Sequence, residues 1–413
     1  MDASTRIVID ETSIRYDGWR VVIVCFVVAT FGWAFGFYGQ SVYLAELHRE
    51  HGWPASLISG ATTFFYLFGA LIVVFVSEAV KKFGPRACLI AGACATAMAA
   101  IGLGQVREPW QLYVANVILA FGWAGMSLGM ITNTLGLWFN KKRGMAISLA
   151  LNGASFGGIA GVPLLVVAIA HFGFPLAMIF AAGVMIALVV PTVLMFVGNP
   201  PRLPGAVASV ADTSSSTQIR AQALRDVAFL SVTAAFALVL FAQVGFIVHL
   251  ISFLDPLIGR ASATTAIALL TAMAVLGRVL FSTVIDRLNQ RLASALSFMS
   301  QAAALLVLIN LRNEYVLIAA CGVFGFSVGN LITLPSLIVQ REFDPHSFGV
   351  LVSLQTAIAQ VTYAFGPGVV GLLHDLSGSY TLPFYGCIAL ELIAAALIML
   401  RAGAAGPRHQ AAS

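Results

Sequence analysis

The chain has 413 residues, of which 60% are hydrophobic and only 9% are charged, and its mean hydropathy is +0.94. A soluble domain carries about 25% charged residues. This composition therefore excludes a water-soluble fold of this size, and lipid must cover part of the surface. The net charge of +5 does not indicate nucleic-acid binding, because cytoplasmic loops give membrane proteins a positive balance.

Twelve apolar runs follow a polar N-terminus, and each is near or above the ~20 residues that a helix needs to cross hydrocarbon. They are 19–44, 57–80, 87–106, 110–136, 144–169, 174–197, 227–253, 262–285, 292–310, 314–338, 347–371 and 380–400. The first run is too long for a signal peptide, so no cleavage is expected. Alternating ten-residue segments of a membrane barrel are absent. The sequence predicts an all-α membrane protein with twelve transmembrane helices.

A longer break at 198–226 divides the runs into two sets of six. Its sequence, GNPPRLPGAVASVADTSSSTQ from 198 to 218, is dominated by Pro, Ser, Thr and Ala, which predicts a flexible linker. We therefore expect an N-terminal tail (1–18), a six-helix bundle (19–197), a linker (198–226), a second six-helix bundle (227–400) and a C-terminal tail (401–413).

The basic residues are distributed unevenly about the spans. Of the 22 Lys and Arg, seventeen lie on one side, in the tails, in alternate breaks and, as Arg20, at the very start of the first run, and one, Arg278, lies deep inside a span. The remaining four, on the opposite side, are Arg49, Arg107, Arg260 and Arg312. By the positive-inside rule, both termini and the linker are cytoplasmic. We expect a multi-pass cell-membrane protein, in the bacterial inner membrane.

The two halves repeat features at an offset of about 200–205 residues. The pattern G-x-x-G-x-S-x-G occurs at 122–129 and again at 322–329, and SEAVKKFGPR (77–86) corresponds to STVIDRLNQR (282–291). Glycines at such positions let helices approach closely. The repeats predict two pseudo-symmetric bundles with a cargo site between them.

Arg278 lies in the apolar run 262–285, where a charge is expensive and usually faces a cavity, a partner or a substrate. Its guanidinium fork matches a carboxylate through two parallel hydrogen bonds. The alternatives are an inter-helix hydrogen bond or partial snorkelling, because Arg278 is roughly 12 Å from Asp286 along a helix. The residue favours an anionic cargo.

The segment 282–291 resembles the G-x-x-x-D-R-x-G-R-R loop of the major facilitator superfamily. Asp286, Arg287 and Arg291 match this pattern. In the first half, Lys82 and Arg86 stand at the positions of Arg287 and Arg291, and Lys81 replaces the acidic residue. The resemblance implies that superfamily's fold and a cytoplasmic gating motif formed by Asp286, Arg287, Arg291, Lys82 and Arg86.

Three further segments resemble the monocarboxylate transporter and oxalate:formate antiporter group. They are YDGWRVV (16–22), WFNKKRGMAISLALNGASFGG (138–158) and VLGRVLFSTVIDR (275–287). The resemblance places Arg278 where an arginine of helix 8 binds substrate carboxylate. Gln40 stands where some members carry a lysine, and 347–371 lacks the lysine of oxalate-type members. A single cation favours a monocarboxylate over a dicarboxylate.

Neutral polar residues are further candidates for substrate binding. Helices 1, 4, 7 and 10 line the cavity in this family, which favours Tyr38, Gln40, Asn133 and Asn330, and Gln355 is added from the eleventh span. The alternative for each is a hydrogen bond between helices.

Three ionisable residues accompany them. Asp255 and His249, near the end of the seventh span, are candidates for proton coupling; a loop acid and a hydrogen-bonded histidine are the alternatives. Glu391 is expected to pair with a neighbouring helix or to stay protonated.

The leading hypothesis is secondary active transport of a small organic anion, with a monocarboxylate as cargo, by proton symport or anion exchange through alternating access. The alternative is a proton-coupled exporter of an amphipathic drug or metabolite, because Gly144, Gly153, Gly157 and Gly161 partly fit an exporter pattern. We expect no enzyme, cofactor or metal site, since no Walker lysine and no His/Cys cluster is present. The partners would be the anion, a proton or exchanged anion, and lipid, and a monomer is expected.

Overall fold

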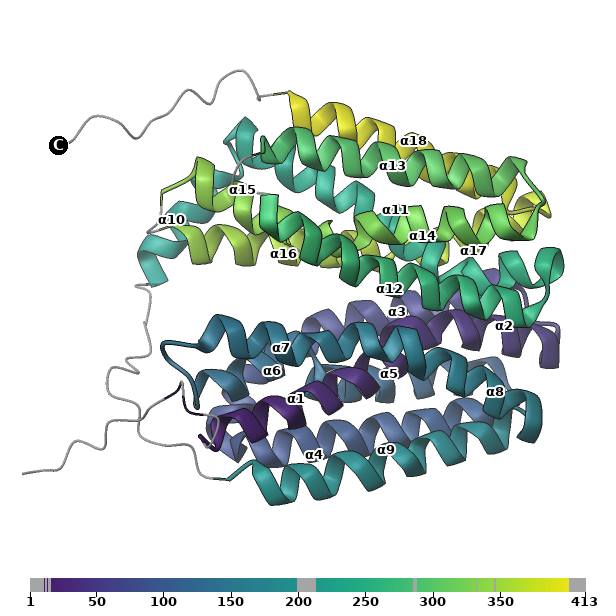
Figure 1. Cartoon of the computed structure of the whole chain (residues 1–413), viewed down its shortest axis with the longest axis horizontal. Helices are drawn as coiled ribbons and strands as arrows, with labels where there is room; N and C mark the ends of the chain where they lie inside the picture. The colour runs from purple at the N-terminus through teal and green to yellow at the C-terminus, as the bar shows by residue number, and fades with distance from the viewer. Residues whose placement is uncertain are drawn as a thin grey trace, which may run out of the picture.

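The computed structural model describes residues 11, 13, 16–198, 213–284, 288–331, 333–344 and 347–400. Within these ranges the chain is helical, without strands, and twelve helical segments are long and apolar enough to cross a membrane. The predicted fold class and the predicted number of spans are both confirmed. Figure 1 shows the first six spans as one bundle lying beside the bundle of the last six.

The first half contains α1 (Gly18–Trp33), the π-helical turn η1 (Ala34–Tyr38), α2 (Gly39–His51), α3 (Ala55–Val73), α4 (Val76–Gln105), α5 (Pro109–Met126), α6 (Leu128–Gly136), α7 (Arg143–Phe156), the π-helical turn η2 (Gly157–Gly161), α8 (Val162–Phe172) and α9 (Phe174–Phe196). Several of these join into one span, as α1, η1 and α2 do.

The second half contains α11 (Val227–Ile258), α12 (Arg260–Val284), α13 (Gln290–Asn310), α14 (Glu314–Leu331), α15 (Leu334–Glu342), α16 (Phe348–Ala364), α17 (Gly366–Ser377) and α18 (Thr381–Met399). The tenth span joins α14 and α15, and the eleventh joins α16 and α17.

Two of the interruptions within spans recur in the corresponding span of the other half, whereas the π-helical turn η1 has no counterpart in α11. The fourth span breaks at Ser127, which has an extended backbone and caps α6, and the tenth breaks after Leu331. The fifth span contains η2, and the corresponding eleventh span breaks at Phe365. Breaks and π-bulges in helices often mark functional positions. The duplicated sequence therefore carries duplicated distortions as well as duplicated helices.

The bundle has two distinct ends. We call the end that carries α10 (Thr213–Ala223) and the breaks after even-numbered spans the linker end, and the opposite end the distal end. At the distal end Gly52, Gly259 and Gly378 adopt positive φ angles of 66°, 79° and 65° as they terminate helices. Glycine tolerates this conformation without a steric penalty, so each span can reverse in a short turn.

Helix α10 occupies part of the segment that we expected to be an irregular linker. It packs against α16, and Ala223 lies in a small apolar cluster with Phe229, Val339 and Leu351. Val339 and Leu351 are far from Ala223 along the chain. The Ser- and Thr-rich composition gave no indication of this docking, which depends on the surface that the second half presents.

Two of the family-like segments meet at the linker end. The rings of Tyr16 and Trp19 lie edge-on to Phe139, with centroids 5.3 and 4.9 Å away, and the Tyr16 hydroxyl donates to the Trp138 carbonyl. A Cβ on Gly18 would lie 2.3 Å from the Tyr16 ring and 2.9 Å from the Phe139 ring, so a larger residue would displace these rings. We call this contact, together with Glu11, the N-terminal clasp.

Glu11 completes the clasp by capping the start of α7. Its two carboxylate oxygens accept hydrogen bonds from the backbone N–H groups of Asn140 (2.9 Å) and Lys142 (2.7 Å). Burial by itself would raise the pKa of the Glu11 carboxyl. The backbone hydrogen bonds from Lys142, Asn140 and Lys141 outweigh burial and hold that pKa below its ordinary value.

Because the pKa of Glu11 is depressed in the folded state, its contribution to stability is present at neutral pH. That contribution is lost as the pH falls through the lowered pKa. We expect Glu11→Gln to release the clasp at neutral pH, measured as faster amide hydrogen exchange at residues 138–143. Glu78→Gln, which changes an exposed carboxylate at the same end, is the control. Unchanged exchange in Glu11→Gln would contradict this role.

Candidate functional site

Arg278 lies on α12 where this helix packs against α14. It is half-buried, and its Nε donates to the Gly329 carbonyl at 3.4 Å. A Cβ on Gly329 would lie 1.9 Å from the Ala274 carbonyl, so this glycine of the repeated pattern lets the two helices touch. Among the described residues, the guanidinium has no carboxylate partner. Most of its five donors remain available to a ligand.

Tyr38 approaches Arg278 from the other half. It ends the π-helical turn η1, is buried, and its hydroxyl lies close enough to the guanidinium for the two to interact electrostatically. A Cβ on Gly158 would lie 2.4 Å from Thr271 of α12 and 3.0 Å from Tyr38. Glycine at 158 therefore lets the first, fifth and eighth spans converge. The structure brings two predicted site residues together between the halves.

Two more tyrosines belong to this region. The ring of Tyr66, on α3, lies edge-on to Tyr363, on α16, with centroids 5.6 Å apart, and it also lies near Phe37, beside Tyr38. The Tyr66 hydroxyl is buried without a hydrogen-bond partner. Sequence analysis missed Tyr66, because a tyrosine within the aromatic run TTFFYLF is not distinguished from a packing residue by spacing.

The predicted amide residues are buried and incompletely bonded. Thr62 donates to Oε1 of Gln40 at 2.9 Å, but Nε2 of Gln40 has no partner, and neither side-chain atom of Gln355 has one. Asn330 donates to the Phe326 carbonyl at 3.4 Å and leaves its Oδ1 unpaired. An unsatisfied buried polar group costs about 1–3 kcal/mol. These atoms are suited to hydrogen bonds with a ligand or with water.

Asn133 differs from these three residues. Its Nδ2 donates to the Gly129 carbonyl at 2.8 Å, and its Oδ1 accepts from Ser77 at 3.3 Å. Both ends of this amide are therefore engaged within the first half. A role for Asn133 in substrate binding stays a prediction that would require these bonds to be exchanged.

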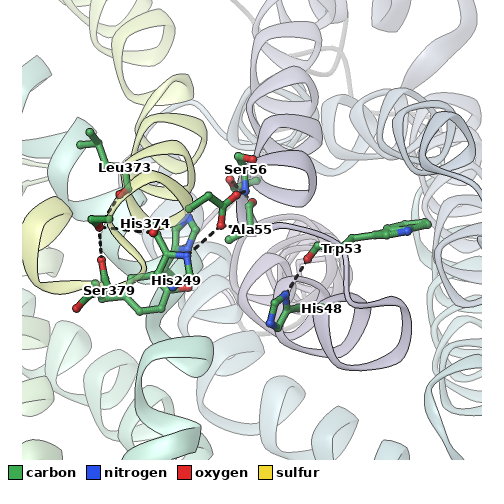
Figure 2. Close-up of polar contacts among 12 residues, drawn as sticks. His48, Trp53, Ala55, Ser56, His249, Leu373, His374 and Ser379 are labelled. Atoms are coloured by element: carbon green, nitrogen blue, oxygen red, sulfur yellow. Dashed lines mark hydrogen bonds and ion pairs between the residues drawn. The ribbon is translucent and has the colours of Figure 1, made fainter.

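His249 and Asp255 are placed differently from one another. His249 is fully buried and bonded at both ring nitrogens, with Tyr380 Oη 3.1 Å from Nδ1 and the Pro367 carbonyl 3.0 Å from Nε2 (Figure 2). The carbonyl can only accept, so Nε2 carries the proton and Nδ1 accepts from the tyrosine. Asp255 is half-buried one turn before the end of α11.

Glu391 is fully buried on α18, and neither of its carboxyl oxygens has a hydrogen-bond partner. Pairing with a neighbouring helix, one of our two expectations, is therefore not what the structure shows. A buried ionised carboxylate without a partner is costly, which leaves the protonated alternative.

Arg291, from the predicted gating motif, is buried inside the second half. Its Nε and Nη2 each donate to one oxygen of Glu342, both at 2.7 Å, and its Nη1 donates to Ser231 (3.0 Å) and to the Ile398 carbonyl (2.8 Å). The bidentate pair and the additional acceptors compensate the buried charge. Arg291 therefore ties α11, α13, α15 and α18 to each other at the linker end.

The remaining members of the gating motif are exposed or undescribed. Arg86 donates to the Leu194 carbonyl at 2.8 Å, and the Lys82 ammonium lies 5.2 Å from the centre of the Phe83 ring. Both contacts lie within the first half. Asp286 and Arg287 lie outside the described residues. Gating by these residues stays a prediction, and each described member binds within its own half.

Polar contacts between the halves gather toward the distal end (Figure 2). The carboxylate of Asp375, on α17, accepts from the backbone N–H groups of Ala55 (3.2 Å) and Ser56 (2.7 Å) at the start of α3. A carboxylate at a helix N-terminus satisfies unpaired donors and the helix dipole. Close by, Glu46 of α2 forms an ion pair with Arg260 of α12.

Comparison with known proteins places this architecture. The family profile of the Major Facilitator Superfamily matches residues 24–367. The chain belongs to the Major Facilitator Superfamily. It is therefore a multi-pass membrane transport protein and not an enzyme, and the predicted family is confirmed.

The chain is similar to named members of the superfamily along nearly its whole length. It is 27% identical to the MFS-type transporter pynF of Aspergillus niger, covering 97% of this chain and 91% of that protein. It is 23% identical to the aspyridones efflux protein apdF of Emericella nidulans (90% and 72%) and 22% identical to monocarboxylate transporter 1 of Rattus norvegicus (94% and 84%).

Among solved structures, the fold resembles a bacterial homologue of the human lysosomal transporter Spinster in an inward-facing and occupied conformation. The TM-score is 0.75 at 16% identity, covering 94% of this chain and 97% of that chain. The likeness supports the fold.

Removal of the Asp375 cap should loosen the distal end. Ser59 of α3 is fully buried where Gly371 of α17 packs onto it. We expect a cysteine placed at Ser59 to react faster with a membrane-impermeant maleimide when Asp375→Ala is added, because α3 and α17 separate more often. Cys88 and Cys94 are first changed to serine.

The matched control for this experiment is Glu50→Ala, which removes an exposed carboxylate from the same end of the molecule. It should leave the labelling rate unchanged. Equal rates with and without Asp375→Ala would show that the cap does not hold the halves together.

Proposed function

We propose that the chain is a secondary active transporter of a small organic anion, with a monocarboxylate as its cargo. The observation that carries this proposal is the half-buried Arg278 guanidinium, which lies between the two halves without a carboxylate partner among the described residues. Guanidinium groups bind carboxylates through two parallel hydrogen bonds. A cargo carboxylate would supply the missing charge, and a rocking motion of the halves would carry it across.

The surroundings of Arg278 fit one carboxylate with an attached organic body. Tyr38 can donate to the same anion, while Tyr66 and Tyr363 offer aromatic surface and, at Tyr66, an unpaired hydroxyl. Gln40 and Gln355, on the spans of Tyr38 and Tyr363, and Asn330, next to Gly329, add unpaired amide atoms. With no second described cation in this region, a monocarboxylate matches the charge better than a dicarboxylate.

Orientation follows from charge. We propose that the linker end and both termini face the cytoplasm of a bacterial inner membrane, because the basic residues concentrate there. The Asp375 and Glu46 contacts would then join the halves at the extracellular end. Both halves belong to one chain, so a monomer suffices for alternating access.

We propose proton symport or anion exchange as the coupling mode, with Asp255 and His249 as candidate proton carriers. His249 already uses both ring nitrogens, so its protonation would require the Tyr380 hydroxyl to stop donating to Nδ1. Such a change would loosen α18 from α11. Asp255 is half-buried at the same end, near the end of α11.

The second candidate is proton-coupled export of an amphipathic metabolite. The similarity to the aspyridones efflux protein favours it, as does the aromatic character of the central region. Growth of a pump-deficient host in toxic dyes discriminates between the two functions. Protection by the wild-type chain that persists in Arg278→Gln would favour export of an uncharged compound.

Arg278→Gln tests the leading proposal directly. We expect proton-driven uptake of labelled pyruvate or lactate into proteoliposomes to fall by at least about tenfold, because a charge-assisted hydrogen bond to the cargo contributes about 1.5–3 kcal/mol. Arg225→Gln, at an exposed arginine of the linker end, is the matched control. Transport that is unchanged in Arg278→Gln would remove this residue from the mechanism.

Tyr66→Phe separates binding from folding. The hydroxyl of Tyr66 has no hydrogen-bond partner among the described residues, so its removal should leave the melting temperature unchanged or slightly higher. Cargo affinity should fall about fivefold or more if the hydroxyl bonds the cargo. Thermal denaturation and uptake kinetics on the same preparation measure the two effects. A fall in melting temperature with unchanged KM would indicate a structural role instead.

A further inference from the structure

A cavity lies at the distal end, away from Arg278. It has a volume of about 470 Å³ and is lined by both halves, with Leu44, His48 and Ala55 from the first half and the remainder from α11, the end of α13, α17 and the start of α18. This volume lies within the ~300–1,000 Å³ typical of small-molecule sites. Neither the family likeness nor the proposed cargo site accounts for this cavity.

The basic side chains of the lining are Arg312, His48 and His374, and the lining contains no Asp or Glu. Nη1 of Arg312 donates to the neighbouring Leu311 carbonyl at 3.3 Å, and the other donors of its guanidinium remain available. His48 bonds the Trp53 carbonyl through Nδ1 at 2.7 Å and keeps Nε2 available (Figure 2).

Three acidic groups are near the cavity. Asp255 stands between the lining residues Phe253 and Pro256 in the chain but is not itself part of the lining, and the other two are engaged elsewhere. Asp375 accepts from the N-terminus of α3 and lies 3.1 Å from Nδ1 of His374. Glu46 pairs with Arg49 and Arg260. The lining itself therefore offers an anion the Arg312 guanidinium and no carboxylate.

The rest of the lining is apolar or aromatic. Phe253, Leu257 and Ile309 form an apolar wall. The rings of Tyr380 and His374 lie beside it, tilted by 32° with their centroids 4.1 Å apart. A wall of this kind beside a guanidinium suits an organic body that carries one negative group. We propose that this cavity is a second binding site, distinct from the Arg278 site, for a water-soluble amphipathic organic carboxylate.

Occupancy of this site has a conformational consequence. Because both halves line the cavity, its shape exists only while α2 and α3 remain against α11 and α17. A ligand that binds one state preferentially shifts the equilibrium toward that state. A carboxylate bound here therefore stabilises the conformation that is closed at the distal end, and so acts as a brake on the transport cycle.

The probe is benzoate, with benzamide as its uncharged counterpart of the same shape. Binding of labelled benzoate to the purified full chain is measured by equilibrium dialysis in the Arg278→Gln background, which removes the proposed cargo site. We expect saturable binding of benzoate and at least tenfold weaker binding of benzamide. Addition of Arg312→Gln should weaken benzoate binding at least tenfold, whereas Arg107→Gln, an exposed distal arginine outside the cavity, should leave it unchanged.

Each contrary result overturns the proposal. Benzoate affinity that is insensitive to Arg312→Gln would place the anion elsewhere, and equal binding of benzamide would remove the role of charge. Loss of benzoate binding when phosphatidylglycerol is added would assign the cavity to a lipid headgroup instead of a soluble carboxylate. Because the background lacks Arg278, these outcomes leave the proposed cargo site untouched.

Discussion

A guanidinium held at the meeting of two apolar bundles is the constraint around which this structure is organised. Its desolvation is tolerable only where donors can reach water or an anion. The glycines at 158 and 329 bring four spans so close that Arg278 and Tyr38 share one region, although they belong to different halves. The small residues of the repeated pattern therefore do more than pack helices. They place the charge where the halves can move around it.

The two ends of the molecule use polar groups in different ways. At the linker end, Arg291 and its partner Glu342 bind several helices of one half into a rigid unit, and the N-terminal clasp does the same for the first half. At the distal end, Asp375 joins one half to the other by capping α3. Strong bonds within halves and fewer, exchangeable bonds between them are what a rocking mechanism requires.

Several buried polar atoms of the central region lack hydrogen-bond partners. Tyr66, Gln40 and Gln355 each bury an atom that lacks a partner, at a cost of about 1–3 kcal/mol apiece. A folded protein tolerates such a cost where function requires it. Binding of a cargo that pairs these atoms recovers part of that cost, and the difference between empty and occupied states then favours closure around the cargo.

The sequence by itself determined the spans, the duplication and the lone arginine. Hydropathy over ~20 residues is a local property that lipid enforces, so twelve spans could be counted without knowing their packing. The repeats at 122–129 and 322–329 and the charge at Arg278 were equally visible in the sequence.

Only the tertiary structure decided which residues become hydrogen-bond partners. Asp375 meets Ser56 across 319 residues, and His249 meets Tyr380 across 131. The contact of Tyr66 with Tyr363 and the basic distal cavity likewise arise from helices that approach from opposite halves. Hydrogen-bond partners over such separations are set by how the helices pack, and no local pattern encodes them.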